Sequence, residues 1–342
     1  MELLIYLILF LLVLIVSSTT NKLLPFLPLP LVQILLGIVI GLFLPNTDFH
    51  LNTELFLALV IGPLLFRESE EADITAILKH WRIIVYLIFP VIFISALSLG
   101  GLAHLLWLSL PLAACLAVGA ALGPTDLVAF ASLSERFSFP KRVSNILKGE
   151  GLLNDASGLV AFQVALTAWT TGVFSLGQAS SSLIFSILGG FLIGFLTAMT
   201  NRFLHSFLLS VRATDIASEL LLELSLPLVT FFLAEEVHVS GIIAVVVAGI
   251  LKASRFKKIT LLEAQVDTVT ETVWHTVNFM LNGSVFVILG MELEMIAEPI
   301  LTNPIYNPLL LLVSLIALTF VLFAIRFVMI YGYYAYRTRR LK

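Results

Sequence analysis

The 342-residue chain is 59% hydrophobic and only 12% charged, with a formal net charge of −3. Because a soluble domain carries about 25% charged residues, this composition excludes a soluble fold. It predicts an all-α polytopic membrane protein that lies in a lipid bilayer, with one transmembrane domain over residues 1–342, no soluble domain and no nucleic-acid partner.

Apolar segments alternate with short polar connections along the whole chain. Judged against about 20 residues for a helix that crosses the bilayer, they predict eleven transmembrane helices. Residues 29–41 are weakly similar to residues 237–249, and the two lie seven positions apart in helix order, which suits an inverted repeat. The predicted segments are residues 3–18, 31–44, 51–66, 83–107, 111–132, 143–170, 181–204, 217–234, 239–251, 272–291 and 308–334.

Basic residues divide the connections into two sets. Lys and Arg outside the segments follow odd-numbered helices, whereas the connections after even-numbered helices carry none. By the positive-inside rule the odd connections are cytoplasmic. The sequence therefore predicts a multi-pass protein of the cell membrane, with its N-terminus outside and its C-terminus in the cytoplasm.

The fifth segment contains a helix-breaking sequence, Gly123-Pro124-Thr125-Asp126-Leu127. Proline removes a backbone donor and clashes with the preceding turn, so we expect a broken helix at residues 123–127. In hydrocarbon, irregular backbone persists only where it lines a cavity or is buried in protein. Thr125 and Asp126 would supply oxygen ligands at the break, as in many transporter ion sites. The simpler alternative is a proline kink in which Asp126 is only an N-cap.

The sixth segment carries polar residues where a membrane helix is deepest. Asn154 and Asp155 lie within the apolar run of residues 146–169, and a charge at such a depth costs about 3 kcal/mol on insertion scales. With Gly151 and Gly158 they share one helical face, which would admit a close helix or a hydrated ion. Asp155 is the best candidate for a titrating residue. The alternative is a structural polar residue that a neighbour satisfies.

Three other charged residues lie in or near the segments. Arg326, well inside the eleventh segment, either snorkels to the interface or pairs with an intramembrane carboxylate. Glu150 is its more natural partner, which leaves Asp155 free to exchange its charge. Glu68, at the end of the third segment, either reaches the cytoplasmic mouth of a cavity or belongs to a solvated helix end.

Other chemistries lack the residues they need. The six histidines and the single cysteine form no zinc-ligand spacing, and neither a Gly-rich phosphate loop nor a nucleophile elbow is recognisable. We therefore expect neither an enzyme nor a cofactor. Acidic and hydroxyl oxygens without sulfur or imidazole suit a hard cation such as Na⁺, Li⁺ or H⁺.

Two motifs together resemble the sodium–proton antiporters of the NhaP/NHE type, within the monovalent cation:proton antiporter superfamily. They are Gly123-Pro124-Thr125-Asp126 and Gly149-Glu150-Gly151-Leu152-Leu153-Asn154-Asp155, and further similar stretches are residues 62–66, 239–246 and 281–290. The resemblance implies an inverted-repeat antiporter with a six-helix core that moves against a dimerising interface domain. It implies a secondary transporter that exchanges a monovalent cation for H⁺ by alternating access, with Na⁺ as the first candidate and Li⁺ or K⁺ as alternatives.

The same resemblance implies roles for single residues. Asp155 would bind the cation or the proton, Thr125 and Asp126 would line the site, and Glu150 would pair with Arg326. Asn154 marks the branch associated with electroneutral exchange.

The chain departs from the family pattern in three places. Leu127 replaces a usual proline, and Gly151 replaces a frequent serine. By the same resemblance we expect the given sequence to lack the last two helices of the family, among them a second broken helix that crosses the first. Two alternatives therefore stand beside the transporter. One is a non-transporting truncated membrane protein. The other is a cation channel, although a single buried Asp beside a broken helix fits alternating access better than a pore.

Overall fold

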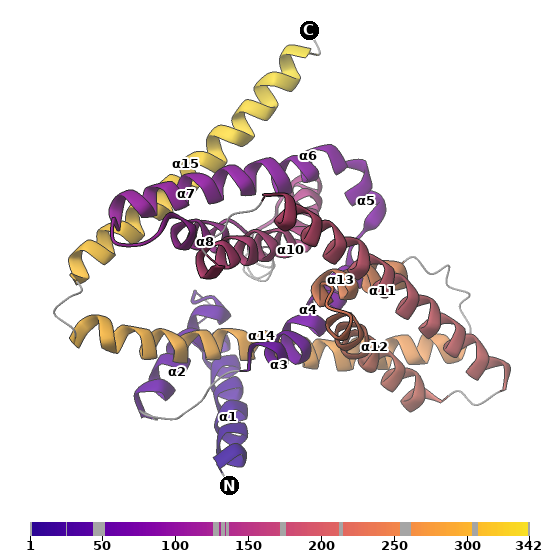
Figure 1. The fold of residues 1–342 in the computed structure, drawn as a ribbon. Helices are drawn as coiled ribbons and strands as arrows, with labels where there is room; N and C mark the ends of the chain where they lie inside the picture. The colour runs from indigo at the N-terminus through magenta and orange to yellow at the C-terminus, as the bar shows by residue number, and fades with distance from the viewer. Residues whose placement is uncertain are drawn as a thin grey trace. The chain divides into compact units, whose positions relative to one another are not determined.

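The computed structural model describes residues 2–24, 26–43, 52–125, 130, 134, 137–171, 176–211, 215–253, 261–302 and 307–340. Within these ranges every regular element is a helix, which confirms the all-α fold class (Figure 1). The elements are α1 (Glu2–Leu23), α2 (Leu29–Phe43), α3 (Thr53–Phe56), η1 (Leu57–Ile61), α4 (Gly62–Glu71), α5 (Ile74–Lys79), α6 (Trp81–Tyr86), η2 (Leu87–Val91), α7 (Ile92–Leu106), α8 (Leu112–Leu122), α10 (Lys141–Thr171), α11 (Leu176–Ser210), α12 (Ile216–Glu236), α13 (Gly241–Ala253), α14 (Leu261–Thr302) and α15 (Pro308–Arg340).

The eleven predicted segments are all helical in the parts that the structure describes, apart from a break in the fifth and a few residues at the ends of others. Five helices in those parts are long and apolar enough to cross a membrane, and four shorter apolar helices accompany them. The helices extend beyond the apolar runs: the 42 residues of α14 span about 63 Å, against about 30 Å for a bilayer core. Hydropathy marks where the chain is apolar, whereas a helix continues through polar residues whose backbone stays hydrogen-bonded.

The connection predicted after the third segment is also helical. There α4 runs on to Glu71 and α5 follows after two residues. Arg67 forms ion pairs with Glu70 at 2.9 Å and with Glu71 at 2.6 Å, three and four residues further along the helix. Such pairs stabilise a helix surface without any apolar periodicity, so a hydropathy pattern does not detect them.

Proline shapes two of the long helices. Pro63 is the second residue after the π-helical element η1, and Pro90 lies inside the second π-helical element, η2. Proline offers no N–H to the preceding turn and crowds its carbonyl, and a wider π turn accommodates both effects. The helix therefore continues through each proline, and α6, η2 and α7 form one long rod (Figure 1).

The chain divides into two compact units. Unit 1 comprises Met1–Ala72, Val128–Ser138 and Phe185–Thr302, which contain α1 to α4, most of α11, and α12 to α14. Unit 2 comprises Asp73–Leu127, Phe139–Ile184 and Asn303–Lys342, which contain α5 to α10 and α15. The single transmembrane domain over residues 1–342, without a soluble domain, stays a prediction.

Small residues set the helix contacts within unit 1. Gly37 of α2 and Gly290 of α14 face each other, and a Cβ on either would meet the backbone of the other helix. A Cβ added at Gly249 of α13 would likewise overlap the Phe66 carbonyl and Ser69 of α4. Membrane helices associate through such close approaches because lipid gives little hydrophobic driving force between them.

A network of mostly buried charges joins four helices of unit 1. Lys252 of α13 lies 3.2 Å from Glu70 of α4 and 2.8 Å from Glu223 of α12. The indole N–H of Trp274, on α14, donates to Glu223 over 2.9 Å. Arg67 adds its own pair with Glu70. The charges alternate in sign, so each one lies within 4.0 Å of an opposite charge, which offsets part of the cost of burying it.

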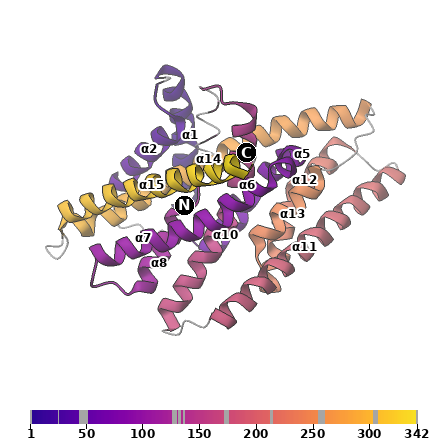
Figure 2. The same cartoon turned by 90° about the horizontal axis from the view of Figure 1, so that it is seen from above.

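Unit 2 is built around the α6–α7 rod. Gly119 of α8 is so close to the Ala96 carbonyl of α7, and Gly100 of α7 to Leu116 of α8, that added Cβ atoms would overlap the facing helix. The last helix, α15, packs against α7 and η2 of the rod; it crosses the rod obliquely in Figure 1 and overlies it in Figure 2. There the Tyr86 hydroxyl donates to the Met329 carbonyl over 3.1 Å.

The start of α12 carries a capping box. The Asp215 side chain accepts from the Ser218 backbone N–H at 2.8 Å, and the Ser218 hydroxyl accepts in turn from the Asp215 N–H at 3.2 Å. The hydrogen bonds with Ser218, first from its side chain and then from its backbone, lower the pKa of the Asp215 carboxyl below its ordinary value. The capped end therefore favours the charged carboxylate, which also suits the helix dipole.

Candidate functional site

The site lies in unit 2, where α8 ends in the middle of the predicted fifth segment. The helix stops at Leu122, and Gly123, Pro124 and Thr125 are not helical. The broken helix predicted there is confirmed over residues 123–125, and residues 126 and 127 lie outside the described residues. Pro124 cannot donate a backbone hydrogen bond, so the last carbonyls of α8 need donors from elsewhere.

Thr125 connects the break to α10. Its hydroxyl oxygen accepts from the Asn154 side-chain amide at 2.7 Å and lies 3.4 Å from Glu150 Oε1, to which it donates. Glu150 and Asn154 are four residues apart on α10, so they occupy the same face one turn above each other. Both side chains are almost fully buried, with 2% of Glu150 and none of Asn154 exposed.

Arg326 reaches this group from α15. Its Nη1 lies 3.3 Å from Glu150 Oε1, and its Nη2 donates to the Gly123 carbonyl at 2.5 Å. One guanidinium therefore neutralises a buried carboxylate and also caps the C-terminal end of α8, where the helix dipole is negative. Only 18% of the Arg326 side chain is exposed.

The contact with Gly123 is one that the sequence reasoning missed. The signal was present, because a Gly-Pro break inside an apolar segment must leave carbonyls that need a donor. Arg326 was also the one basic residue placed deep in a segment. The sequence analysis offered a carboxylate as the partner of Arg326 and did not include a backbone carbonyl as a second acceptor.

Close packing holds α10 against the break. A Cβ added at Gly158 would overlap the ring of Pro124, so only glycine lets the two approach this closely. Gly151, Asn154 and Gly158 are all buried. The small polar face predicted for this helix is therefore the face that meets α8, since the two helices pack together.

The other predicted site residues fall elsewhere. Asp155 lies on α10, one residue after Asn154, and its side chain is outside the described residues. Asp126 is outside them altogether. Glu68 is half-buried on α4, which belongs to unit 1. The structure thus brings together Thr125, Glu150 and Asn154 with Arg326.

One polar atom in the group is left over. Asn154 Oδ1 is buried and has no hydrogen-bond partner among the described residues, while its amide nitrogen is held by Thr125. A buried acceptor without a partner costs about 1–3 kcal/mol. An oxygen kept at such a cost is suited to a hard cation, which takes oxygen ligands.

The fold is that of a known class of membrane transporter. The structure resembles the sodium proton antiporter MjNhaP1 from Methanocaldococcus jannaschii at a TM-score of 0.64, with 20% identity over 85% of this chain and 71% of that one. The family model described as sodium/hydrogen exchanger, transmembrane, matches residues 7–340. The chain belongs to this sodium/hydrogen exchanger family.

Curated relatives carry matching names. The chain is 36% identical over 312 residues to the sodium, potassium, lithium and rubidium/H⁺ antiporter of Bacillus subtilis, covering 91% of this chain and 47% of that protein. It is 35% identical to the antiporter of the same name from Bacillus pumilus, covering 96% of this chain and 49% of that protein. The chain thus spans about half the length of these curated relatives.

Proposed function

We propose that the chain is a secondary transporter that exchanges a monovalent cation for H⁺ across the membrane by alternating access, with Asp155 as the group that holds either ion. Family membership supports the reaction class. The observation that carries the site assignment is the Glu150–Arg326 pair at 3.3 Å, because it already neutralises the other carboxylate on this part of α10. Asp155 is then the carboxylate left to bind an ion.

The surroundings suit a small hard cation. Asn154 contributes a buried oxygen without a partner in the described part of the chain, and the Thr125 hydroxyl lies 2.7 Å from the amide of the same residue. We assign Asp126 as a further oxygen ligand and Glu68 to the entrance of the ion path. Carboxylate, amide and hydroxyl oxygens are the ligands that alkali cations and protons share.

The charge count favours electroneutral exchange. One uncompensated carboxylate holds either one proton or one monovalent cation, so a full cycle moves no net charge. In the variant Asn154→Asp a second carboxylate would join the site. We expect this variant to make transport respond to an imposed membrane potential, whereas wild-type exchange rates stay independent of the potential.

The names of two relatives indicate which cations to propose as substrates of this chain. The two Bacillus proteins are named as antiporters of sodium, potassium, lithium and rubidium. We propose the same group of alkali cations for this chain, with Na⁺ as the first to test. Proteoliposomes with an internal pH dye, given each chloride salt in turn, would rank them by the rate of alkalinisation.

The topology and the assembly complete the proposal. The basic residues after odd-numbered helices support an N-terminus outside and a cytoplasmic C-terminus. A homodimer is the assembly that the family resemblance supports. Single cysteines placed at exposed Lys22, after the first predicted helix, and at exposed Thr53, near the start of the third, should be labelled from opposite sides of the membrane. Native mass spectrometry would measure the assembly.

Asp155→Asn tests the site assignment. An amide cannot exchange a proton for a cation, so we expect cation-dependent proton movement in everted vesicles to disappear while the protein still inserts. Asp215→Asn is the matched control, since it makes the same chemical change at an exposed helix cap where asparagine caps equally well. Normal cation-induced proton release by the Asp155 variant would refute the assignment.

A further inference from the structure

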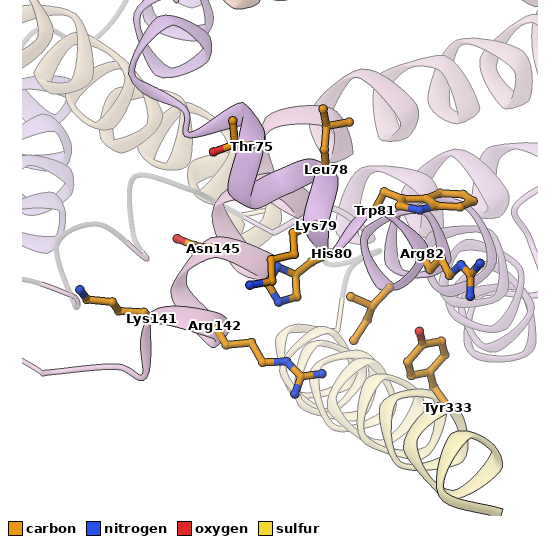
Figure 3. Close-up of a pocket in the computed structure, with 11 residues that line it drawn as sticks. Thr75, Leu78, Lys79, His80, Trp81, Arg82, Lys141, Arg142, Asn145 and Tyr333 are labelled. Carbon is orange, nitrogen blue, oxygen red and sulfur yellow. The ribbon is translucent and has the colours of Figure 1, made fainter. Parts of the chain in front are cut away.

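Unit 2 contains a cavity that the transport site does not use. Its volume is about 1050 Å³, and it lies where α5, α6, the start of α10 and the end of α15 come together (Figure 3). None of the residues that form the group around Thr125 lines it. The lining residues are Thr75, Leu78, Lys79, His80, Trp81, Arg82, Ile83, Lys141, Arg142, Asn145 and Tyr333.

The lining is strongly basic. It includes Lys79, Arg82, Lys141 and Arg142, which are exposed, together with His80, and it contains no carboxylate. In the part of the chain that the structure describes, none of the four Lys and Arg side chains has a carboxylate within 4.0 Å. Several like charges gathered around one hollow repel each other, so the cavity favours an anion.

Backbone and aromatic groups add to this preference. Lys141 and Arg142 are the first two residues of α10, so the cavity lies beside a helix N-terminus with its unpaired N–H groups and positive dipole end. Arg82 lies over the Trp81 ring at 5.7 Å, and the Trp81 side chain is half exposed. In Figure 3 the side chains of Arg142 and Tyr333 extend from α10 and α15 toward the same hollow.

A ring of basic residues alone would only mark a cytoplasmic membrane face, so the shape of the site matters. Here the charges line a concave site next to Trp81, Tyr333 and the exposed Leu78. Aromatic residues of this kind lie at the headgroup level of a bilayer. Basic pockets between membrane helices take phosphate headgroups, and a volume near 1000 Å³ lies at the upper end of the range for small-molecule sites.

We propose that this cavity binds the phosphate group of an anionic phospholipid headgroup. The shared chemistry is a phosphate ester, which a soluble phosphate compound would also offer. The exposed apolar and aromatic residues beside the charges favour the lipid as its source, because a soluble anion gains nothing from them. This inference concerns binding and does not depend on the transport mechanism.

Lipid binding can be counted on the purified full chain. After removal of native lipid in detergent, native mass spectrometry would measure bound phosphatidylglycerol, with phosphatidylcholine as the neutral comparison. We expect saturable binding of phosphatidylglycerol that weakens as salt rises. Each Lys or Arg contributes about fivefold near a charged lipid surface, so Lys141→Gln/Arg142→Gln should weaken binding by about 10- to 25-fold.

The control removes the same charge from outside the cavity. Lys22→Gln/Arg202→Gln changes two exposed basic residues that do not line it: Lys22 follows the first predicted segment, and Arg202 lies near the end of the seventh. Equal losses in the two double variants would overturn the proposal, because binding would then follow overall charge. Equal binding of the two lipids by wild type would also overturn it.

Two further measurements distinguish the sources. Binding of inorganic phosphate or of glycerol phosphate, with no saturable phosphatidylglycerol bound, would refute the lipid assignment in favour of a soluble anion. In bilayers, phosphatidylglycerol brominated near the headgroup should quench the part of the tryptophan fluorescence that Trp81→Phe removes. If the Trp81→Phe variant loses no quenched component, the headgroup does not occupy this cavity.

Discussion

The two partners of the buried ion pair should differ in how much stability they carry. Arg326→Met removes the contact to Glu150 at 3.3 Å and also the hydrogen bond to the Gly123 carbonyl at 2.5 Å. Glu150 would then stay buried, with 2% exposure and only the Thr125 hydroxyl as a partner. Glu150→Leu leaves Arg326 with the carbonyl and with its 18% exposure to solvent.

These contacts set the expected magnitudes. Breaking a buried ion pair by removing one partner costs about 3–5 kcal/mol, and a hydrogen bond to a charged group contributes about 1.5–3 kcal/mol. Arg326→Met loses both the ion pair and the hydrogen bond to Gly123, so its cost should lie at the upper end of the range of about 3–5 kcal/mol. Glu150→Leu keeps the hydrogen bond from Arg326 to the Gly123 carbonyl and should be less destabilising by about 1.5–3 kcal/mol. The double variant should cost less than the sum of the two, because no charge is left uncompensated.

Equilibrium unfolding in mixed micelles, followed by circular dichroism, would measure the four members of this cycle. Arg202→Met, at an exposed position, is the control for the loss of an arginine and should change the stability little. If Glu150→Leu is as damaging as Arg326→Met, the hydrogen bond to Gly123 contributes nothing. If the double variant equals the sum of the single variants, the pair does not stabilise the fold.

Three further predictions concern packing, the site and acid stability. Gly100→Ala should destabilise the protein by about 1–3 kcal/mol, because the new methyl group overlaps α8. Gly101→Ala is the control, since its methyl group meets open space and should not lower the stability. Thermal unfolding in detergent would compare the two variants. Thr125→Val should leave the Asn154 amide without its acceptor and slow exchange in proteoliposomes, while Thr125→Ser should retain it; equal rates for the two variants would contradict this role. Because the pKa of Asp215 is lowered, its cap stabilises α12 fully above the ordinary carboxyl pKa of 3.8 and is lost as pH falls through the lower folded value. Hydrogen exchange of the backbone amides at the start of α12 should therefore become faster in acid. If the exchange rates of Asp215→Ala equal those of wild type at neutral pH, the cap contributes nothing.

The sequence alone predicts the helices well because membrane insertion depends on composition. In hydrocarbon every backbone group must be bonded internally, so an apolar stretch of sufficient length is a helix whatever surrounds it. The break after Leu122 follows in the same way from Gly123-Pro124. Boundaries such as Leu261 of α14 were missed, because a helix outside the apolar layer is maintained by local pairs and caps that hydropathy does not measure.

Only the tertiary structure decided which polar residues meet. The sequence indicated that Arg326 needs a partner and offered Glu150, but the two are 176 residues apart, and their distance of 3.3 Å depends on how α15 packs against the rod. The sequence also did not predict that the Gly123 carbonyl is a second acceptor for Arg326. Nor did it predict the basic cavity where α5, α6, α10 and α15 meet. Periodicity and composition report on neighbours along one helix, whereas these groups are brought together by contacts between helices far apart in the chain.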